Sequence, residues 1–589
     1  MKIVIANCVG IDSDGWFIIP YPSRWTTSAK DHSDAFTYYP KDLGYLTALL
    51  KQNTNHKVKL VDACLDRQNK EEYAETIIKE KPDWLVMESS TRTFNEDIWV
   101  AQEVKKEIGA KIMMTGQHPS AFADETSKHC DVVIKGEYLA PALHFFNHGG
   151  NGAGSGVIDF NKTNLMDVSR LPFPEDVDVS RYDYALKADP ICRYREIQLY
   201  TSRGCPYSCV FCVASHTYYG GPDWRPRPVK SIIGEMRFLY EKYPELEGMF
   251  FDDEIHNASI KRVKELSKAI VKAGFDDRRY NAMCAYHTFD RESLELMKRA
   301  GYYLVRVGIE TASDEVADGL NLRGKYRPAK LEKFLNDAKQ IGMEVYGTFT
   351  VGGPRSSREE DRKTIRLMEG LIEDNYLSDC QISICTPQPG APFYEWAVEN
   401  GALSRKTWSE FDGGVSSVLS LPGYSGESID QIRREALTAY DRARSVRDKQ
   451  LFQNNWNEQS DRIGPAPEKL LIFRSSRDWH LRMLLEAVGA KWPGADIAML
   501  CHEKFIVSYK QDFPRLEFIP YLHEGFLNAQ RLGESSLAAM KKFDPDAALI
   551  PSNVYHCRGY GNVTLIAEKL KIKSVLFVNS LGLIRSAGS

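Results

Sequence analysis

Residues 205–212 read Cys205-Pro-Tyr-Ser-Cys209-Val-Phe-Cys212, so three of the 12 cysteines of the chain lie on one short stretch. Structural zinc sites use four ligands, commonly in paired C-x2-C units, whereas this motif supplies three. Three thiolates on one loop suit three irons of a [4Fe–4S] cluster and leave the fourth iron open to another ligand. The sequence therefore predicts such a cluster. The alternatives are a zinc site and three buried cysteines without a metal.

The cysteine loop lies near the start of a series of alternating strand and helix patterns between residues 190 and 424. Apolar segments predict strands there, and helical spacing between them is clearest at 229–243 and 259–273. The predicted strands are 196–201, 248–251, 280–285, 304–309, 344–350 and 380–386. A succession of βα units predicts a partial (β/α)6 barrel, in which ligands bind at the carboxyl ends of the strands.

Further α/β segments flank the barrel, which makes the whole chain α/β in class. Residues 1–150 alternate buried strands with helices, so we predict a doubly wound, Rossmann-like domain with helices on both faces of a parallel sheet. A linker is expected at 151–189, after a glycine-rich stretch, and a helical connector at 425–464. Residues 465–589 are expected to form a C-terminal α/β accessory domain.

Composition excludes several classes of function. The chain has 589 residues, of which 43% are hydrophobic, and a net charge of −4, which argues against binding to nucleic acid. No apolar run reaches the roughly 18–20 residues of a membrane-spanning helix. The first ten residues, MKIVIANCVG, read as a buried strand rather than a signal peptide. We therefore expect a cytoplasmic protein without a membrane span, in which cysteines stay reduced.

The cysteine loop resembles that of radical S-adenosylmethionine (SAM) enzymes, in which an aromatic residue, here Phe211, precedes the third cysteine. Further blocks between 190 and 400 resemble the branch of this superfamily that carries cobalamin (B12)-binding domains, with its class B methyltransferases and anaerobic cyclases. In order, these blocks are Trp224–Arg227 (WRPR), Phe250–Glu254 (FFDDE), Gly308–Thr311 (GIET), Gly347–Pro354 (GTFTVGGP) and Pro387–Pro392 (PQPGAP).

The resemblance implies how SAM is held. The three cysteines would bind the cluster, whose open iron chelates the amino and carboxylate groups of SAM. Asp252, Asp253 or Glu254 would accept hydrogen bonds from the SAM ammonium group, and Glu310 would bind the ribose or the methionine moiety. The alternatives are a solvated loop tip for the acidic trio and a buried salt bridge for Glu310.

The adenine of SAM would lie against the protein backbone in the same resemblance. Backbone groups near Phe211, Gly352 and Gly353 would hold it, because glycine permits a close approach of the main chain. No side chain is singled out as catalytic.

The N-terminal segment resembles the cobalamin-binding domain of the same branch in its turns at 39–45 (YPKDLGY), 115–120 (TGQHPS) and 135–137 (KGE). Turns at the carboxyl ends of strands form the ligand-binding edge of such sheets. The side chains and backbone expected near the corrin are those of Ser89, Thr91, Gly116, Gln117 and His118. For His118 the alternative is a turn histidine that bonds to the backbone.

The cobalt-ligating pattern D-x-H-x-x-G is absent from the chain, and residues 12–15 read Asp-Ser-Asp-Gly at its expected place. Many members of the branch lack this histidine and still bind cobalamin. The resemblance thus implies cobalamin whose lower face has no protein ligand.

The resemblance implies cobalamin-dependent C-methylation. SAM would be cleaved to a 5′-deoxyadenosyl radical, which would activate an unactivated carbon to take a methyl group from methylcobalamin. The partners would be a small-molecule or lipid substrate and a reductant such as flavodoxin or ferredoxin. An alternative is cobalamin-independent cyclisation, rearrangement or C–C bond formation. More remote are a non-catalytic Fe–S sensor and a tRNA methylthiotransferase, which would need Cys8, Cys64 and Cys130 to hold a second cluster.

Overall fold

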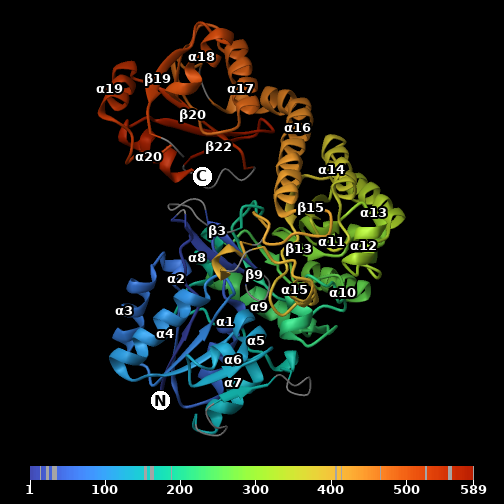
Figure 1. Ribbon diagram of the computed structural model, residues 1–589. Helices are drawn as coiled ribbons and strands as arrows, with labels where there is room; N and C mark the ends of the chain where they lie inside the picture. Colours follow the sequence, from blue (N-terminus) through green and yellow to red (C-terminus); the bar gives the residue numbers. More distant parts are fainter. Residues whose placement is uncertain are drawn as a thin grey trace. The chain divides into compact units, whose positions relative to one another are not determined.

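The computed structural model divides at Tyr440 into two units, one ending there and the other formed by the residues from Asp441 onward. It contains three six-stranded sheets, which confirms the predicted α/β class (Figure 1). No helix among the described residues is long and apolar enough to cross a membrane. The structure describes the chain apart from residues 14, 22–24, 30–35, 151–155, 160–164, 188, 405–406, 413, 464–465, 524–526, 555–559 and 588–589.

The first sheet is parallel throughout and has the order β4-β1-β5-β6-β7-β8. The order reverses next to β1, which makes the carboxyl ends of β1 and β5 the expected ligand crevice of a doubly wound sheet. The strands are β1 (Lys2–Ala6), β4 (Lys57–Val61), β5 (Trp84–Glu88), β6 (Lys111–Thr115), β7 (Val132–Ile134) and β8 (Gly156–Ile158).

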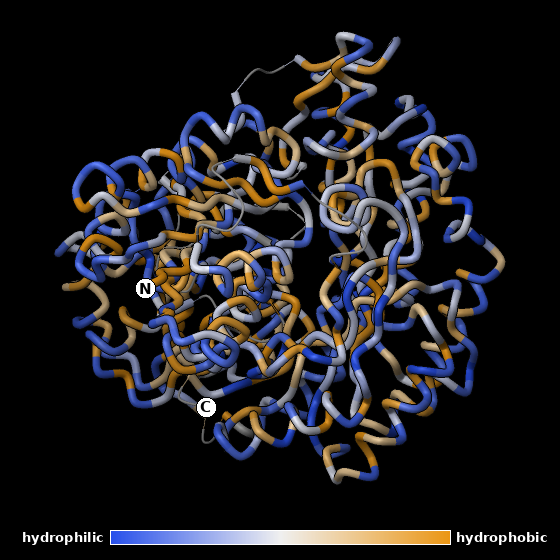
Figure 2. Tube along the Cα trace, turned by 90° about the horizontal axis from the view of Figure 1, so that it is seen from below, coloured by the Kyte–Doolittle hydropathy of each residue, from blue (hydrophilic) through white to orange (hydrophobic). Residues whose placement is uncertain are grey.

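Both faces of this sheet are covered by helices, as predicted. Successive side chains of a strand point to opposite faces. Ile3 and Ile5 accordingly pack with α1 (Lys41–Asn53) and α7 (Leu139–Asn147), whereas Val4 and Ala6 pack with α3 (Lys70–Glu80) and α4 (Phe94–Ile108). Figure 2 shows hydrophobic stretches in the interior of the trace and hydrophilic ones along outer helices.

Two features of this region were not predicted. Strand β8 extends the sheet into a stretch expected to be linker, and a hairpin of β2 (Phe17–Tyr21) and β3 (Trp25–Ala29) follows β1. Short helices fill the connections: α2 (Ala63–Asp66), α5 (Gln117–Ala121), α6 (Ala123–Thr126) and α8 (Arg181–Leu186).

The second sheet is the predicted partial barrel, with parallel strands in the sequential order β16-β15-β14-β13-β12-β9. Its edge strands β9 and β16 do not pair with each other in the described chain, so the barrel is open. The strands are β9 (Glu196–Leu199), β12 (Gly248–Phe251), β13 (Arg279–Cys284), β14 (Tyr302–Glu310), β15 (Glu344–Val351) and β16 (Asp379–Ile384). A small pair, β10 (Ser202–Arg203) and β11 (Arg225–Pro226), brackets the cysteine loop.

Helices follow the barrel strands in turn, and each buries an apolar stripe; α10, for example, buries Val263, Leu266 and Ile270. The helices are α9 (Val229–Lys242), α10 (Ile260–Lys272), α11 (Arg291–Arg299), α12 (Asp314–Gly319), α13 (Pro328–Ile341), α14 (Arg358–Glu373) and α15 (Pro392–Glu399). The π-helical turn Ala214–Tyr218 follows the cysteine loop directly.

Helix α16 (Gly426–Gln459) includes the boundary between the units, and the second unit then forms the third sheet, in the order β19-β18-β17-β20-β21-β22. Cores lie on both faces, with Leu471 and Phe473 on one and Leu470 and Ile472 on the other. The elements are β17 (Lys469–Phe473), α17 (Asp478–Lys491), β18 (Asp496–His502), α18 (Glu503–Asp512), β19 (Glu517–Tyr521), α19 (Glu534–Phe543), β20 (Ala547–Ser552), α20 (Gly561–Lys569), β21 (Ser574–Asn579) and β22 (Ile584–Ser586).

Candidate functional site

The three cysteines of the 205–212 loop lie just after β10 and carry free thiols. Burial, and then the negative charge of Cys212, raise the pKa of Cys205 to about 12, while the nearby ammonium of Lys325 acts in the opposite direction. The thiols are thus close enough to repel one another when ionised. Three free thiols that lie near one another on one loop are the donor set for three irons of a [4Fe–4S] cluster, so these residues fit that group.

The first two acidic residues after β12 have other partners than those predicted. Asp253 accepts hydrogen bonds from the backbone N–H groups of Thr201 (2.6 Å) and Ser202 (2.8 Å). Asp252 accepts one from the side-chain amide of Gln198 at 2.7 Å. Both carboxylates are buried, and neither residue lines the large cavity of the barrel. The oxygen atoms of both carboxylates accept hydrogen bonds from protein donors. In this structure the two residues therefore hold the chain that leaves β9 in place and are not left open to the SAM ammonium group.

Glu254 has a similar role. It forms a buried ion pair with Lys41 (3.0 Å) from the start of α1 and accepts a hydrogen bond from the backbone of Gly204 at 3.1 Å. Glu254 is therefore not part of a solvated loop tip, and it does not line the cavity. The acidic trio therefore anchors residues 198–204, the segment that leads into the cysteine loop.

Arg203 is a buried charge beside this loop, and only 3% of its side chain is exposed. It pairs with Asp42 at 2.5 Å and with Glu137 at 2.6 Å, both from the first domain. Arg225 of the WRPR block also pairs with Glu137, at 3.1 Å. Two arginines of the barrel are thus neutralised by carboxylates of the first domain, close to Cys205.

A cavity of about 510 Å³ opens beside the cluster loop in the barrel. Phe211, Cys212 and Glu310, to which the resemblance gives roles at the cluster or at SAM, line it together. Further lining residues come from the barrel strands and the segments after them (Met283, Arg306, Cys385 and Gln388) and from the segment before α1 (Tyr38).

Glu310 reaches this cavity through a distortion of β14. The pairing register with β15 shifts between Gly308 and Glu310, and Glu310 has a φ of 67°. A bulge of this kind re-aims a side chain, and a positive φ in a non-glycine residue is a strain that functional sites retain. Burial raises the pKa of Glu310, and Lys325 opposes that shift. No salt bridge holds Glu310 within the described part of the chain, contrary to the structural alternative.

The two glycines predicted to approach adenine lie outside the cavity lining. Gly352 has a φ of 69°, and a Cβ there would lie 2.6 Å from the side chain of Ile429. Its N–H donates to Asp361 at 2.9 Å. The space beside Gly352 is therefore filled by protein, because the turn packs against α16 at this point.

Gly116 forms a close contact at the ligand edge of the first sheet. Its φ is 106°, and a Cβ would lie 2.6 Å from the backbone oxygen of Ser89. The Ser89 hydroxyl donates to buried Asp97 at 2.6 Å, whereas the buried hydroxyl of Thr91 has no partner among the described residues. Glycine is required at position 116 because the turn packs against the backbone after β5. The unpartnered hydroxyl of Thr91 is a polar atom at this edge that a bound corrin could use.

His118 is fully buried, but not as a turn histidine bonded to the backbone. Its ring stacks on Phe94 with centroids 3.9 Å apart, and Phe122 and Trp408 each lie 5.0 Å away. Neither ring nitrogen has a hydrogen-bond partner in the described structure. Burial lowers the pKa of His118 to about 3, so the ring is neutral. An unsatisfied imidazole at this edge leaves a donor and an acceptor for a bound group.

Gln117 joins the two domains at this edge. Its side-chain amide donates to the side chain of Gln388 at 3.1 Å, and Gln388 lines the SAM-type cavity. The turn predicted to face the corrin is thus one hydrogen bond away from the cavity beside the cluster loop.

Two further expectations concern the turn at 12–15, where the cobalt-ligating motif is absent, and a second iron–sulfur cluster held by Cys8, Cys64 and Cys130. Asp14 lies outside the described residues, so the 12–15 turn is only partly visible. Cys8 and Cys64 follow the carboxyl ends of β1 and β4, whereas Cys130 precedes the amino end of β7. In a parallel sheet these are opposite edges, so the three thiols do not meet, which argues against a methylthiotransferase.

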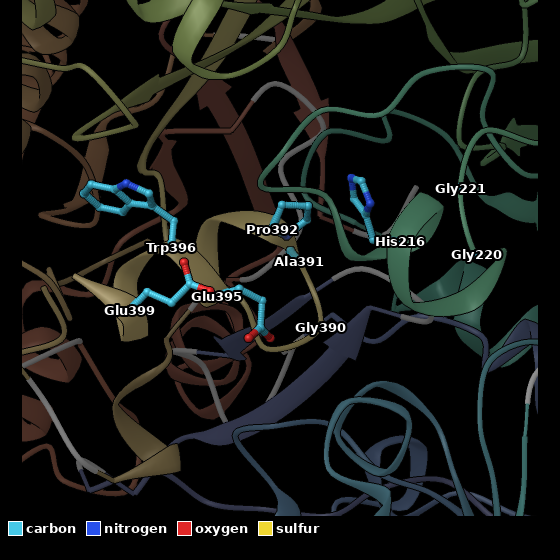
Figure 3. Close-up of a pocket in the computed structure, with 9 residues that line it drawn as sticks. All are labelled: His216, Gly220, Gly221, Gly390, Ala391, Pro392, Glu395, Trp396 and Glu399. Carbon is cyan, nitrogen blue, oxygen red and sulfur yellow. The ribbon is translucent and has the colours of Figure 1, made fainter. Parts of the chain in front are cut away.

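A second cavity of about 540 Å³ flanks the cluster loop on another side. Figure 3 shows His216 facing helix α15, which carries Glu395, Trp396 and Glu399. The His216 ring bonds to the carbonyl oxygen of Cys209 at 3.2 Å. Neither His216 nor Lys325 was predicted from the sequence, since neither residue belongs to a recognised block.

Comparison with known proteins supports the same two domain types. The Radical SAM superfamily matches residues 199–368, and the B12 binding domain matches residues 33–143. The chain is 27% identical over 434 residues to an uncharacterised methyltransferase of Pyrococcus horikoshii, which covers 71% of this chain and 90% of that protein. It is 25% identical over 351 residues to bacteriochlorophyllide d C-12(1)-methyltransferase of Chlorobaculum tepidum, covering 58% and 72% respectively.

A solved structure has a similar fold. It is the radical SAM methyltransferase TsrM from Kitasatospora setae, with tryptophan and a SAM analogue bound. The TM-score is 0.54 at 17% identity, covering 69% of this chain and 77% of that one. The family matches, their order along the chain and the cysteine loop agree, and the chain carries a radical SAM domain preceded by a B12-binding domain.

Proposed function

We propose that the protein is a cobalamin-dependent radical SAM methyltransferase that methylates an unactivated carbon of a small-molecule or lipid substrate. The observation that carries this proposal is the hydrogen bond between Gln117 and Gln388. It connects the cobalamin-type turn to the cavity that Cys212 and Glu310 line. A methyl donor next to a SAM site is what such a transfer requires.

Different residues would hold the cluster and SAM. Cys205, Cys209 and Cys212 would hold the cluster, and Glu310 and Phe211 would hold SAM in the cavity. When bound, the cluster and SAM supply reductive C–S cleavage, and cobalamin supplies a transferable methyl group. The chain itself orients these groups, because strand ends and buried aromatic side chains such as Tyr346 and Phe349 line the cavity.

The corrin would lie on the turns that hold Ser89, Thr91 and 116–118. The unsatisfied atoms of Thr91 and His118 support this location, since buried polar groups in proteins are normally paired. No protein ligand to cobalt is proposed. Two relatives are named methyltransferases, which supports transfer of a methyl group by this chain as well.

The function is tested by anaerobic reconstitution with iron, sulfide and hydroxocobalamin, followed by incubation with SAM, a strong reductant and a metabolite extract. We expect about one cobalamin per chain and a product that carries the methyl group of isotopically labelled SAM. A flavodoxin or ferredoxin would supply the electron in the cell. Turnover that needs no cobalamin, with products that lose hydrogen and gain no labelled carbon, would favour radical cyclisation or rearrangement instead.

Glu310 provides the sharpest test of the SAM site. Glu310→Gln should leave the iron content unchanged and weaken SAM binding. One charged hydrogen bond is worth on the order of 1.5–3 kcal/mol, or about 10–150-fold in affinity. Anaerobic equilibrium binding measures this loss. Glu344→Gln, at the amino end of β15, is the matched control, because Glu344 pairs with Arg193 outside the cavity lining. Equal SAM affinity of wild type and Glu310→Gln would assign Glu310 a structural role.

A further inference from the structure

The segment 320–325, between α12 and α13, clamps the cysteine loop from outside the recognised sequence blocks. The backbone N–H of Val210 donates to the carbonyl oxygen of Leu320 at 3.2 Å. The side-chain amide of Asn321 donates to the backbone oxygen of Ser208 at 2.9 Å. These bonds hold the loop on both sides of Cys209, and they fix the position of segment 320–325 relative to that thiol.

Lys325 lies at the end of this clamp and faces the thiols. Its ammonium nitrogen is 3.9 Å from Sγ of Cys209 and 5.9 Å from the centre of the Tyr207 ring. Gly324 packs against the same ring, since a Cβ there would lie 3.0 Å from it. The packing of the neighbouring Gly324 against the Tyr207 ring thus directs the Lys325 ammonium group at the loop. Lys325 is half-buried there.

The charge of Lys325 has no ordinary partner. No carboxylate lies within 4 Å of its nitrogen in the described structure, whereas most charges in this region are paired. Its ammonium group instead contacts Sγ of Cys209, at 3.9 Å.

We propose that Lys325 is a positioning residue for electron transfer, whose fixed positive charge next to Cys209 makes the cluster easier to reduce. The inference rests on the proposed ligation of the cluster by the three cysteines. Reduction adds one electron from the external reductant to the cluster and breaks no bond. A cation 3.9 Å from a ligating sulfur stabilises the more negative, reduced form more than the oxidised form. Lys325 thereby offsets part of the cost of reducing a cluster enclosed in protein.

The test compares Lys325→Met, Lys325→Gln and Lys325→Arg with the wild-type chain after anaerobic reconstitution. Lys333→Met is the matched control, because it removes the same charge from an exposed residue that pairs with Asp337 on α13. Iron content is measured first, and the midpoint potential is then obtained by a dithionite titration followed by electron paramagnetic resonance. SAM affinity is measured on the same samples.

Loss of the charge should lower the midpoint potential and leave iron content near the wild-type value. We expect the equilibrium constant for reduction of the cluster to change at least tenfold, which corresponds to a shift of about 59 mV in the midpoint potential of a one-electron couple. Lys325→Arg should restore most of the shift, and Lys333→Met should show none. SAM affinity should stay within about twofold, since the proposed contact is with the cluster.

Three outcomes would overturn the proposal. The first is an unchanged potential in Lys325→Met and Lys325→Gln that carry full clusters. The second is a large loss of SAM affinity at unchanged potential, which would make Lys325 a ligand of the SAM carboxylate. The third is loss of iron from both uncharged variants. Failure of the wild-type chain to take up iron is a different result, because it contradicts the cluster itself.

Discussion

Replacement of Cys205, Cys209 and Cys212 by alanine should remove about four irons per chain and abolish reductive cleavage of SAM. The thiols are free and lie close enough to affect one another's ionisation, and no other cysteine belongs to this loop. Alanine cannot bind iron, so no partial cluster should survive. Iron and sulfide analysis, with the visible absorption of the cluster, measures the first effect. Chromatography of SAM cleavage products measures the second.

The matched control replaces Cys130 and Cys380, two other half-buried cysteines, by alanine. Cys130 donates to a backbone oxygen of α6 at 3.3 Å, and Cys380 lies in β16, so neither shares the loop. The control should keep its iron and its activity. Circular dichroism of both proteins excludes unfolding. A triple variant that still bound four irons would show that the cluster has other ligands.

Arg203→Met should lower the free energy of unfolding of the first unit by about 3–5 kcal/mol. The guanidinium of Arg203 neutralises Asp42 and Glu137, and its removal leaves Asp42 buried beside an apolar side chain. Removal of one partner of a buried ion pair lowers the free energy of unfolding by more than the pair contributes, because the remaining charge cannot reach water. Hydrogen exchange of peptides from β1 and β9 over a urea series measures this free energy locally.

Exposed Arg323 provides the comparison, since it forms a surface pair with Asp318. Arg323→Met should change stability by about 0–1 kcal/mol. Adding Asp42→Asn to Arg203→Met should restore part of the loss, because the stranded carboxylate is then neutral. Equal stabilities of Arg203→Met and Arg323→Met would mean that the network around Glu137 contributes nothing net to the fold.

The architecture could be predicted from the sequence because each buried strand is marked by the apolar pattern of its own residues. Segment 248–251, for example, was predicted with the bounds that the structure has. Strands β8 and β19 were missed for a physical reason. β8 has only three residues, and β19 contains Pro520, so neither has an apolar run that stands out before a neighbour pairs with it.

The site was predictable where a motif lies on one loop, and less so where contacts come from distant elements. The cavity brings Phe211, Cys212 and Glu310 together. One of Asp252, Asp253 and Glu254 was expected to accept hydrogen bonds from the SAM ammonium group. Asp253 bonds to the chain after β9, and an acidic pair after a strand does not reveal which donors the neighbouring strand presents. Lys325 lies more than a hundred residues beyond Cys209, so only tertiary structure shows their contact.

The buried ion pairs between the first domain and the barrel have a consequence for how such proteins can be rebuilt. Lys41 with Glu254 and Arg203 with Asp42 and Glu137 all cross between these domains. A barrel joined to a foreign cobalamin domain would keep Arg203 and Glu254 without their partners, and the transplanted surface would bring unmatched charges of its own. The two domains are therefore not interchangeable modules. Recombination between relatives should succeed only where the crossover leaves each of these charged residues together with its original partner.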